Sequence, residues 1–174
     1  MKADTLDYRA ETLADHTDIE ALHAEAFGPG RFARAAFRLR EGVPHDPALS
    51  FIATSEQILV ASVRLTPITI GGRSVLLLGP LAVKPAFKGQ GAGRALVRMA
   101  VAAAREAGHR VILLVGDLPY YAPLGFQALP RRAVILPSPV DPDRVLAAEL
   151  VPGALEGLSG PARRIAPEPQ GSSD

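Results

Sequence analysis

Three glycines at alternating positions, Gly89, Gly91 and Gly93, stand directly before an alanine-rich stretch with helical periodicity. Glycine lets a ligand approach the backbone closely, and the first turn of a helix presents N–H groups that have no partner within the helix. Those groups and the helix dipole, equivalent to about half a positive charge, attract phosphate. We therefore predict that this loop binds the phosphate of a ligand.

Two common phosphate-binding loops do not fit these residues. A Rossmann dinucleotide site requires G-x-G-x-x-G directly after a strand, but Arg94 or Leu96 occupies the third glycine position, depending on the starting glycine. Residues 84–88 also separate the glycines from the preceding apolar run. A P-loop requires Gly-Lys-Ser/Thr, which occurs nowhere in the chain. A nucleotide-binding domain is thus the least favoured alternative.

A third pattern matches both this loop and a segment further along the chain. The first segment is an apolar strand end, Leu81-Ala82-Val83, with a short turn, Lys84-Pro85, and the glycine loop Lys88-Gly89-Gln90-Gly91-Ala92-Gly93. The second segment, further along, is Tyr121-Ala122-Pro123-Leu124-Gly125-Phe126. These segments resemble the GNAT superfamily of acyl-CoA-dependent N-acyltransferases, which has R/Q-x-x-G-x-G/A and then Tyr-x-x-x-Gly-Phe. Lys88 departs from the usual arginine or glutamine. The run Gly-Asp-x-Pro-Tyr-Tyr resembles one bacterial branch of predicted acetyltransferases in this superfamily.

The resemblance implies a fold and a way of binding acetyl-CoA (or coenzyme A). The fold is mixed α/β, with a central, mostly antiparallel sheet that is splayed at the CoA site and has helices on both faces. Backbone N–H groups from about 89 to 94 would bind the pyrophosphate, and an N–H near Leu81 or Ala82 would stabilise the oxyanion. The implied cofactor-binding residues are Leu81, Ala82, Val83, Lys88, Gly89, Gln90, Gly91, Ala92, Gly93 and Arg94.

The resemblance also assigns a catalytic residue, because Tyr121 matches the general acid that protonates the departing CoA thiolate. A phenol suits this role, since its ordinary pKa of about 10 keeps it protonated at neutral pH. Tyr120 is the weaker candidate. The alternative role for Tyr121 is to pack under the turn at Gly125.

The sequence does not identify the general base. Residues 74–83 contain no ionisable side chain, although some superfamily members carry a carboxylate on this strand. The proton acceptor could be Asp117, His45, Asp46 or a water molecule. The alternative for each of these three side chains is an ordinary role in a turn or on the surface.

The expected reaction is acetyl transfer to a primary amine by direct attack in a ternary complex, because no nucleophile for a covalent intermediate is evident. The alternative is a non-catalytic acyl-CoA-binding or regulatory module. The acceptor could be a small molecule or a protein amine. Arg31, Arg34 and Arg38 share a helical face that could attract an acidic acceptor, although a solvated surface is the more ordinary interpretation.

Periodicity and turn residues predict the elements that position this loop. Gly71-Gly72 predicts a hairpin, and Pro67 indicates a bulge or an edge position in the strand before it. Expected helices cover 17–27, 31–40 and 92–107, and expected strands cover 8–13, 51–54, 58–70, 74–83, 110–115, 133–136 and 145–151.

Composition limits the remaining possibilities. The 174 residues are 48% hydrophobic and 21% charged, which fits a single domain over 1–165 with a disordered tail at 166–174. A net charge of +1 gives no reason to expect nucleic acid or a membrane surface as partner. Without cysteine, and with four histidines at no metal-binding spacing, we expect no metal. A polar start and the lack of a long apolar run favour a soluble cytoplasmic protein. We expect it to be a monomer or a homodimer.

Overall fold

The computed structural model describes residues 5–30 and 34–165. Arg31 and the expected tail at 166–174 lie outside the described residues. Within the described part, none of the helices is long and apolar enough to cross a membrane.

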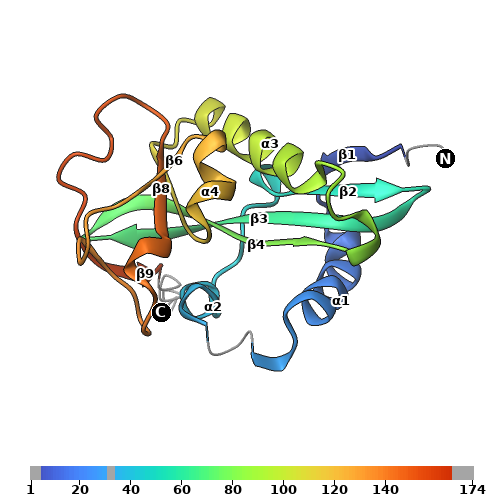
Figure 1. Ribbon diagram of the computed structural model, residues 1–174, viewed down its shortest axis with the longest axis horizontal. Coiled ribbons are helices and arrows are strands. Elements are labelled where there is room, and N and C mark those ends of the chain that lie inside the picture. Colours follow the sequence, from blue (N-terminus) through green and yellow to red (C-terminus); the bar gives the residue numbers. More distant parts are fainter. Residues whose placement is uncertain (1–4, 31–33, 166–174) are drawn as a thin grey trace, which may run out of the picture.

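One mixed sheet forms the centre of the molecule (Figure 1). Its strands are β1 (Asp7–Ala10), β2 (Phe51–Ser55), β3 (Ile58–Ile70), β4 (Arg73–Val83), β5 (Val111–Val115), β6 (Phe126–Ala128), β7 (Val134–Ile135), β8 (Val145–Glu149) and β9 (Gly160–Arg164). The main order is β1-β2-β3-β4-β5-β8-β6, while β9 pairs with β3 and β7 with β9. Among the described strand pairs, only β4–β5 and β7–β9 are parallel. This architecture confirms the mixed, mostly antiparallel fold that the sequence predicts.

Helices cover both faces of the sheet (Figure 1). They are α1 (His16–Phe27), α2 (Ala35–Arg40), α3 (Ala92–Glu106) and α4 (Leu118–Tyr121). Helices α1 and α2 lie on one face, and α3 and α4 on the other. The apolar stripe of α3 is buried because Leu96, Val97 and Ala100 recur at helical spacing and pack on the strands.

The β3–β4 hairpin positions the site. Gly71 and Gly72 both have positive φ, and the tight turn sets the register of Ile70 opposite Arg73. Pro67 lies inside β3. Along one edge of β3, β2 pairs up to Val63 and β9 pairs from Ile68 onward, so Pro67 falls in the gap between these two partners. Its missing N–H therefore removes no hydrogen bond along that edge. The register shifts where Val63 pairs with Leu81 but Leu65 pairs with Leu78, so β4 bulges at Gly79-Pro80.

The two parallel strands β4 and β5 soon diverge. They pair at Leu76–Ile112 and Leu77–Leu113, and within the described residues the ladder between them extends no further. Strand β4 continues to Val83, so its edge from Gly79 onward has no β5 partner. This divergence is the splay that the resemblance implies.

Two expected boundaries need correction, and two strands were not expected. The first strand ends at Ala10 rather than Leu13, and α2 starts at Ala35 within the described residues rather than at Arg31. The sequence did not predict β6 or β9. Both are short, and their partners, β8 and β3, come from distant parts of the sequence, so local periodicity carries little signal for them.

Candidate active site

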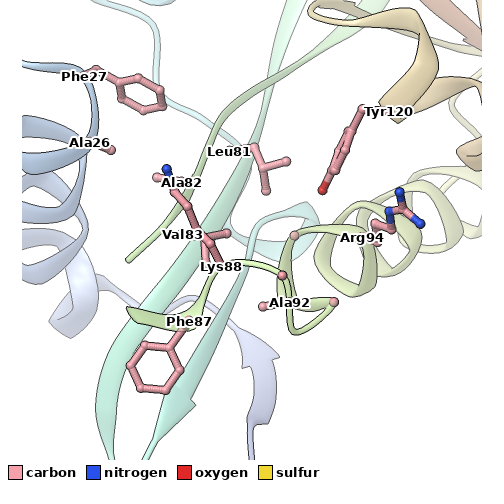
Figure 2. A pocket seen from close by; sticks show the side chains of 13 residues that line it. Ala26, Phe27, Leu81, Ala82, Val83, Phe87, Lys88, Ala92, Arg94 and Tyr120 are labelled. Carbon is pink, nitrogen blue, oxygen red and sulfur yellow. The ribbon is translucent and has the colours of Figure 1, made fainter. Parts of the chain in front are cut away.

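A cavity of about 650 Å³ lies where β4, the glycine loop and the first turn of α3 meet (Figure 2). Its lining residues are Ala26, Phe27, Leu81, Ala82, Val83, Phe87, Lys88, Gly89, Gly91, Ala92, Gly93, Arg94 and Tyr120. The structure thus brings together all the predicted cofactor-binding residues except Gln90. The Gln90 side chain instead donates to the carbonyl of Ala86 at 3.5 Å.

The loop glycines are required for two different reasons. Gly89 and Gly91 have φ of +80° and +86°, the left-handed region that favours glycine, and a Cβ at either would meet open space. Gly93 lies inside α3, where a Cβ would come within 2.6 Å of the Tyr120 hydroxyl oxygen. Gly91 is the N-cap of α3, so the unpaired N–H groups of the first turn lie at the cavity.

The charge of the cavity favours an anion. Lys88 and Arg94 are its cationic side chains, and no carboxylate or imidazole occurs among the described residues that line it. The Arg94 guanidinium lies 5.4 Å from the centre of the Tyr120 ring, which places its charge beside the first turn of α3. These two cations add to the partial positive charge of the helix start.

The edge of β4 forms the middle of the cavity. Successive residues alternate, since Leu81 and Val83 pack towards the α3 face while Ala82 packs with Ile19 and Leu22 towards α1. Figure 2 shows Leu81, Ala82 and Val83 between the α1 side and the Tyr120–Arg94 side. Because β5 diverges here, backbone N–H and C=O groups along this edge of β4 are available to a ligand.

Two adjacent tyrosines of α4 have different surroundings. Tyr120 lines the cavity, whereas Tyr121 does not. The Tyr121 ring packs edge-on against Phe126, with 5.7 Å between the ring centres, and it covers Gly116 just after β5. Burial, followed by the nearby Tyr120 and Asp117, raises the pKa of Tyr121 to about 12. Burial also raises the pKa of Tyr120, with Arg94 opposing the shift.

The three side chains considered as general base have structural partners and do not line the cavity. Asp117 lies 3.4 Å from Nε of Arg144 and is largely exposed. His45 pairs through Nε2 with the carboxylate of buried Glu11. Asp46 accepts a hydrogen bond from the N–H of Ala48 at 3.0 Å and so caps a short 3-10 turn. The geometry supports none of them as the proton acceptor at the cavity.

Sequence reasoning missed several lining residues. Ala26 and Phe27 come from the end of α1, far from the loop in sequence, and only tertiary packing brings them there. Phe87 lies in the 3-10 turn Pro85–Phe87, next to residues that the motif does identify. Helical periodicity at Phe27 indicated only a core position, so no local signal marked it as part of a site.

Sequence comparisons identify related proteins. A model of the Acetyltransferase (GNAT) family matches residues 16–126. The uncharacterized N-acetyltransferase YjhQ of Escherichia coli is 31% identical over 118 residues, which cover 66% of this chain and 65% of that protein. The uncharacterized N-acetyltransferase YhbS of Escherichia coli is 26% identical over 155 residues, which cover 87% of this chain and 92% of that protein.

Solved structures of GNAT family acetyltransferases also superpose on this chain. A GNAT family N-acetyltransferase (YhbS) from Escherichia coli in complex with CoA superposes with a TM-score of 0.79 at 25% identity, covering 95% of this chain and 92% of that chain. A GNAT family acetyltransferase from Brucella melitensis in complex with acetyl-CoA has a TM-score of 0.60 at 28% identity, covering 88% and 99%.

Proposed function

The chain belongs to the Acetyltransferase (GNAT) family, and we propose that it transfers an acetyl group from acetyl-CoA to a primary amine within a ternary complex. The observation that carries this proposal is one continuous cavity that joins the glycine loop, the start of α3 and the free edge of β4. The CoA and acetyl-CoA complexes of the two solved relatives support it.

In this proposal, different parts of the cavity bind different parts of acetyl-CoA. The N–H groups from Gly89 to Arg94, with the side chains of Lys88 and Arg94, bind the pyrophosphate. Charge-assisted hydrogen bonds contribute about 1.5–3 kcal/mol each, so a few of them suffice to bind the donor. The free edge of β4 from Leu81 to Val83 pairs with the amides of the pantetheine arm, which directs the thioester towards the splay.

The reaction then needs three events at the thioester. The neutral amine attacks the carbonyl carbon, and an N–H near Leu81 or Ala82 stabilises the negative oxygen that forms. The carbon–sulfur bond breaks, the thiolate takes a proton from a tyrosine hydroxyl, and water returns a proton to the resulting phenolate. The proton lost by the amine passes to water, since the described residues lining the cavity include no carboxylate or imidazole.

We assign the proton donor to Tyr121, which matches the motif and whose ring lies against Gly116 beside the splay. Its raised pKa keeps the hydroxyl protonated, as an acid in this position requires. The Tyr120 hydroxyl lies beside Gly93 at the start of α3 and points towards Leu81 on β4 (Figure 2). Because Tyr121 is the tyrosine that matches the motif, we assign Tyr120 to donor binding.

Two measurements test the proposed function. Acetyl-CoA should raise the melting temperature through linkage, while NAD and ATP should leave it unchanged. A panel of primary amines should then release CoA from acetyl-CoA in the presence of the protein, with the acetylated amine detected by mass spectrometry. Binding of acetyl-CoA without acetylation of any amine would support the non-catalytic module instead, and stabilisation by NAD but not CoA would overturn the proposal.

A further inference from the structure

A buried ionic cluster lies on the α1–α2 face of the sheet. Arg64 of β3 is 6% exposed and has partners for each of its nitrogens. Its Nε donates to Glu11 at 3.2 Å, its Nη1 to Glu20 at 3.0 Å, and its Nη2 lies 3.3 Å from Nδ1 of His16. The second carboxylate oxygen of Glu11 pairs with His45. Arg64 and Glu11 therefore satisfy each other within the cluster.

A second arginine beside this cluster lacks such a partner. Arg40 ends α2, and its Nη1 lies 3.1 Å from the position that a Cβ of Gly79 would occupy. Among the residues that the structure describes, no carboxylate lies within 4.0 Å of its guanidinium, whereas both carboxylates of the cluster are bound to Arg64. Burial and the charge of Arg64, opposed by the attraction of Glu20, lower the pKa of Arg40 to about 10, so it remains a cation at neutral pH.

The position of Arg40 relates it to the proposed reaction. Gly79 lies in the β4 bulge, two residues before Leu81, and two residues of chain span at most about 7 Å. The backbone beside the guanidinium is therefore within about 7 Å, along β4, of the position proposed for the thioester. Ala26 and Phe27 of α1 line the same cavity, so the cavity reaches the face of the sheet that α1 and α2 cover, although Arg40 itself is not among the described residues that line it.

From this arrangement we infer that Arg40 binds the carboxylate of the amine acceptor, so that the preferred acceptors are short amino acids with a few bonds between amine and carboxylate. Guanidinium binds carboxylate through two parallel, charge-assisted hydrogen bonds. The bound anion would supply the counter-ion that Arg40 lacks. It would also hold the amine near the thioester, because a spacing of at most about 7 Å along β4 suits a short acceptor with a few bonds between amine and carboxylate.

The inference rests on the proposed function and is tested with length-matched acceptors. Glycine, β-alanine and 4-aminobutyrate are compared with ethylamine, propylamine and butylamine, each with acetyl-CoA. The wild-type protein should prefer at least one of the acids by tenfold or more in kcat/KM. Arg40→Gln should remove that preference mainly by raising KM, because the contact is made equally in the ground and transition states. Arg40→Lys should retain part of it.

Arg98→Gln provides the control, since Arg98 is exposed on α3 and is not among the residues that line the cavity. It should leave the preference unchanged. Arg40→Gln must also keep its affinity for acetyl-CoA, which shows that the protein is folded. A purely structural role for Arg40 predicts that Arg40→Gln lowers the melting temperature but leaves the ratio of acid to uncharged amine as in the wild type, and that result overturns the inference.

Failure of the inference can be separated from failure of the proposed function. If uncharged amines are acetylated as well as the acids, acetyl transfer stands and the role of Arg40 is wrong. If no amine is acetylated, calorimetry in the presence of CoA compares 4-acetamidobutyrate with the length-matched N-butylacetamide. Tighter binding of the acid that Arg40→Gln abolishes supports the carboxylate site without transfer, and equal binding of the two overturns it.

Discussion

At Gly91 the backbone has φ of +86° and the direction of a side chain points into open space. That space is the part of the cavity proposed to hold pyrophosphate. Gly108, after α3, has a similar φ of +88° and equally open surroundings, but it is not among the residues that line the cavity. The two glycines thus share their conformational requirement and differ only in location.

Gly91→Glu should therefore abolish acetyl-CoA binding by placing a bulky negative group at the pyrophosphate position. Gly108→Glu carries the same backbone penalty of about 1–2 kcal/mol but should bind acetyl-CoA as the wild type does. Calorimetry with both variants makes the comparison. Equal affinity for acetyl-CoA in the two variants would show that the phosphates bind elsewhere.

The two adjacent tyrosines allow an equally close comparison. Tyr121→Phe should lower turnover by about 10²–10⁴ with little change in acetyl-CoA affinity, as expected for a general acid that acts in the transition state. Tyr120→Phe should mainly weaken acetyl-CoA binding, because its hydroxyl contacts the start of α3. Steady-state kinetics and calorimetry on both variants give the pattern, and the reverse result would make Tyr120 the proton donor.

The pH dependence of the reaction follows from the same residues. The pKa of Tyr121 is raised to about 12, so its protonated form is lost only as pH rises through that value. Since the described lining residues include no side-chain base, the amine must be neutral when it attacks. We expect kcat/KM to rise with pH towards the pKa of the acceptor and to show no decline up to pH 10. A decline between pH 7 and 9 in a profile measured with a stable protein would contradict this assignment.

At the scale of the elements, one acidic side chain stabilises the 3-10 turn (Leu13–Asp15) that leads into α1. Asp15 accepts two hydrogen bonds from Arg9 at 2.7 Å and one from the N–H of Thr12 at 2.8 Å, before the helix that carries Ala26 and Phe27 to the cavity. Chiefly because of Arg9, the pKa of Asp15 falls from 3.8 to about 2. The carboxylate therefore stabilises the folded chain above pH 4, and this contribution is lost as pH falls through about 2.

Asp15→Asn should lower the free energy of unfolding by about 1 kcal/mol at pH 7, a value reduced for the exposure of Arg9. The difference from the wild type should shrink as pH falls from 4 to 2. Urea unfolding at several pH values measures it. Asp18→Asn is the control, because Asp18 is exposed in the first turn of the same helix and should change stability by only a few tenths of a kcal/mol.

At the scale of the whole molecule, the splay between β4 and β5 separates a ligand-accessible edge from a closed core. Strand β5 is buried and pairs with β8 along its full length, from Val111 to Val115. Strand β4 pairs with β3 on one side, but its other edge is free after Leu77. The free edge is thus available for binding while the remainder of the sheet keeps its hydrogen bonds.

Acetyl-CoA should therefore slow amide hydrogen exchange along residues 79–83 and 89–94, where its amides and phosphates are proposed to bind. Exchange in β5 and β8 should change little, because those amides are already paired and buried. Mass-spectrometric exchange with and without acetyl-CoA tests this, with NAD as the negative control. Protection confined to other segments would exclude the free edge of β4 as the binding surface.

Much of the scaffold could be predicted from local sequence. The helix after the glycine loop, the hairpin at Gly71-Gly72 and the strand ending at Val83 follow from periodicity and turn chemistry, which act over a few neighbouring residues. The geometry of the glycine loop depends on backbone conformation, so the spacing of its glycines, together with the motif around them, predicted where the cavity would form. The strands β6 and β9 were missed because their pairing depends on distant partners.

Tertiary structure alone decided which side chains share the site. Tyr120 and Tyr121 are adjacent in sequence but occupy different environments. Successive side chains of a helix point in different directions, so the Tyr120 ring faces the cavity and the Tyr121 ring packs against Phe126. His45 is unsuited as a base at the cavity because it pairs with Glu11, which lies 34 residues earlier in the sequence. Arg40 meets Gly79 only because α2 packs beneath the sheet. Such contacts depend on long-range packing, which no pattern of neighbouring residues specifies.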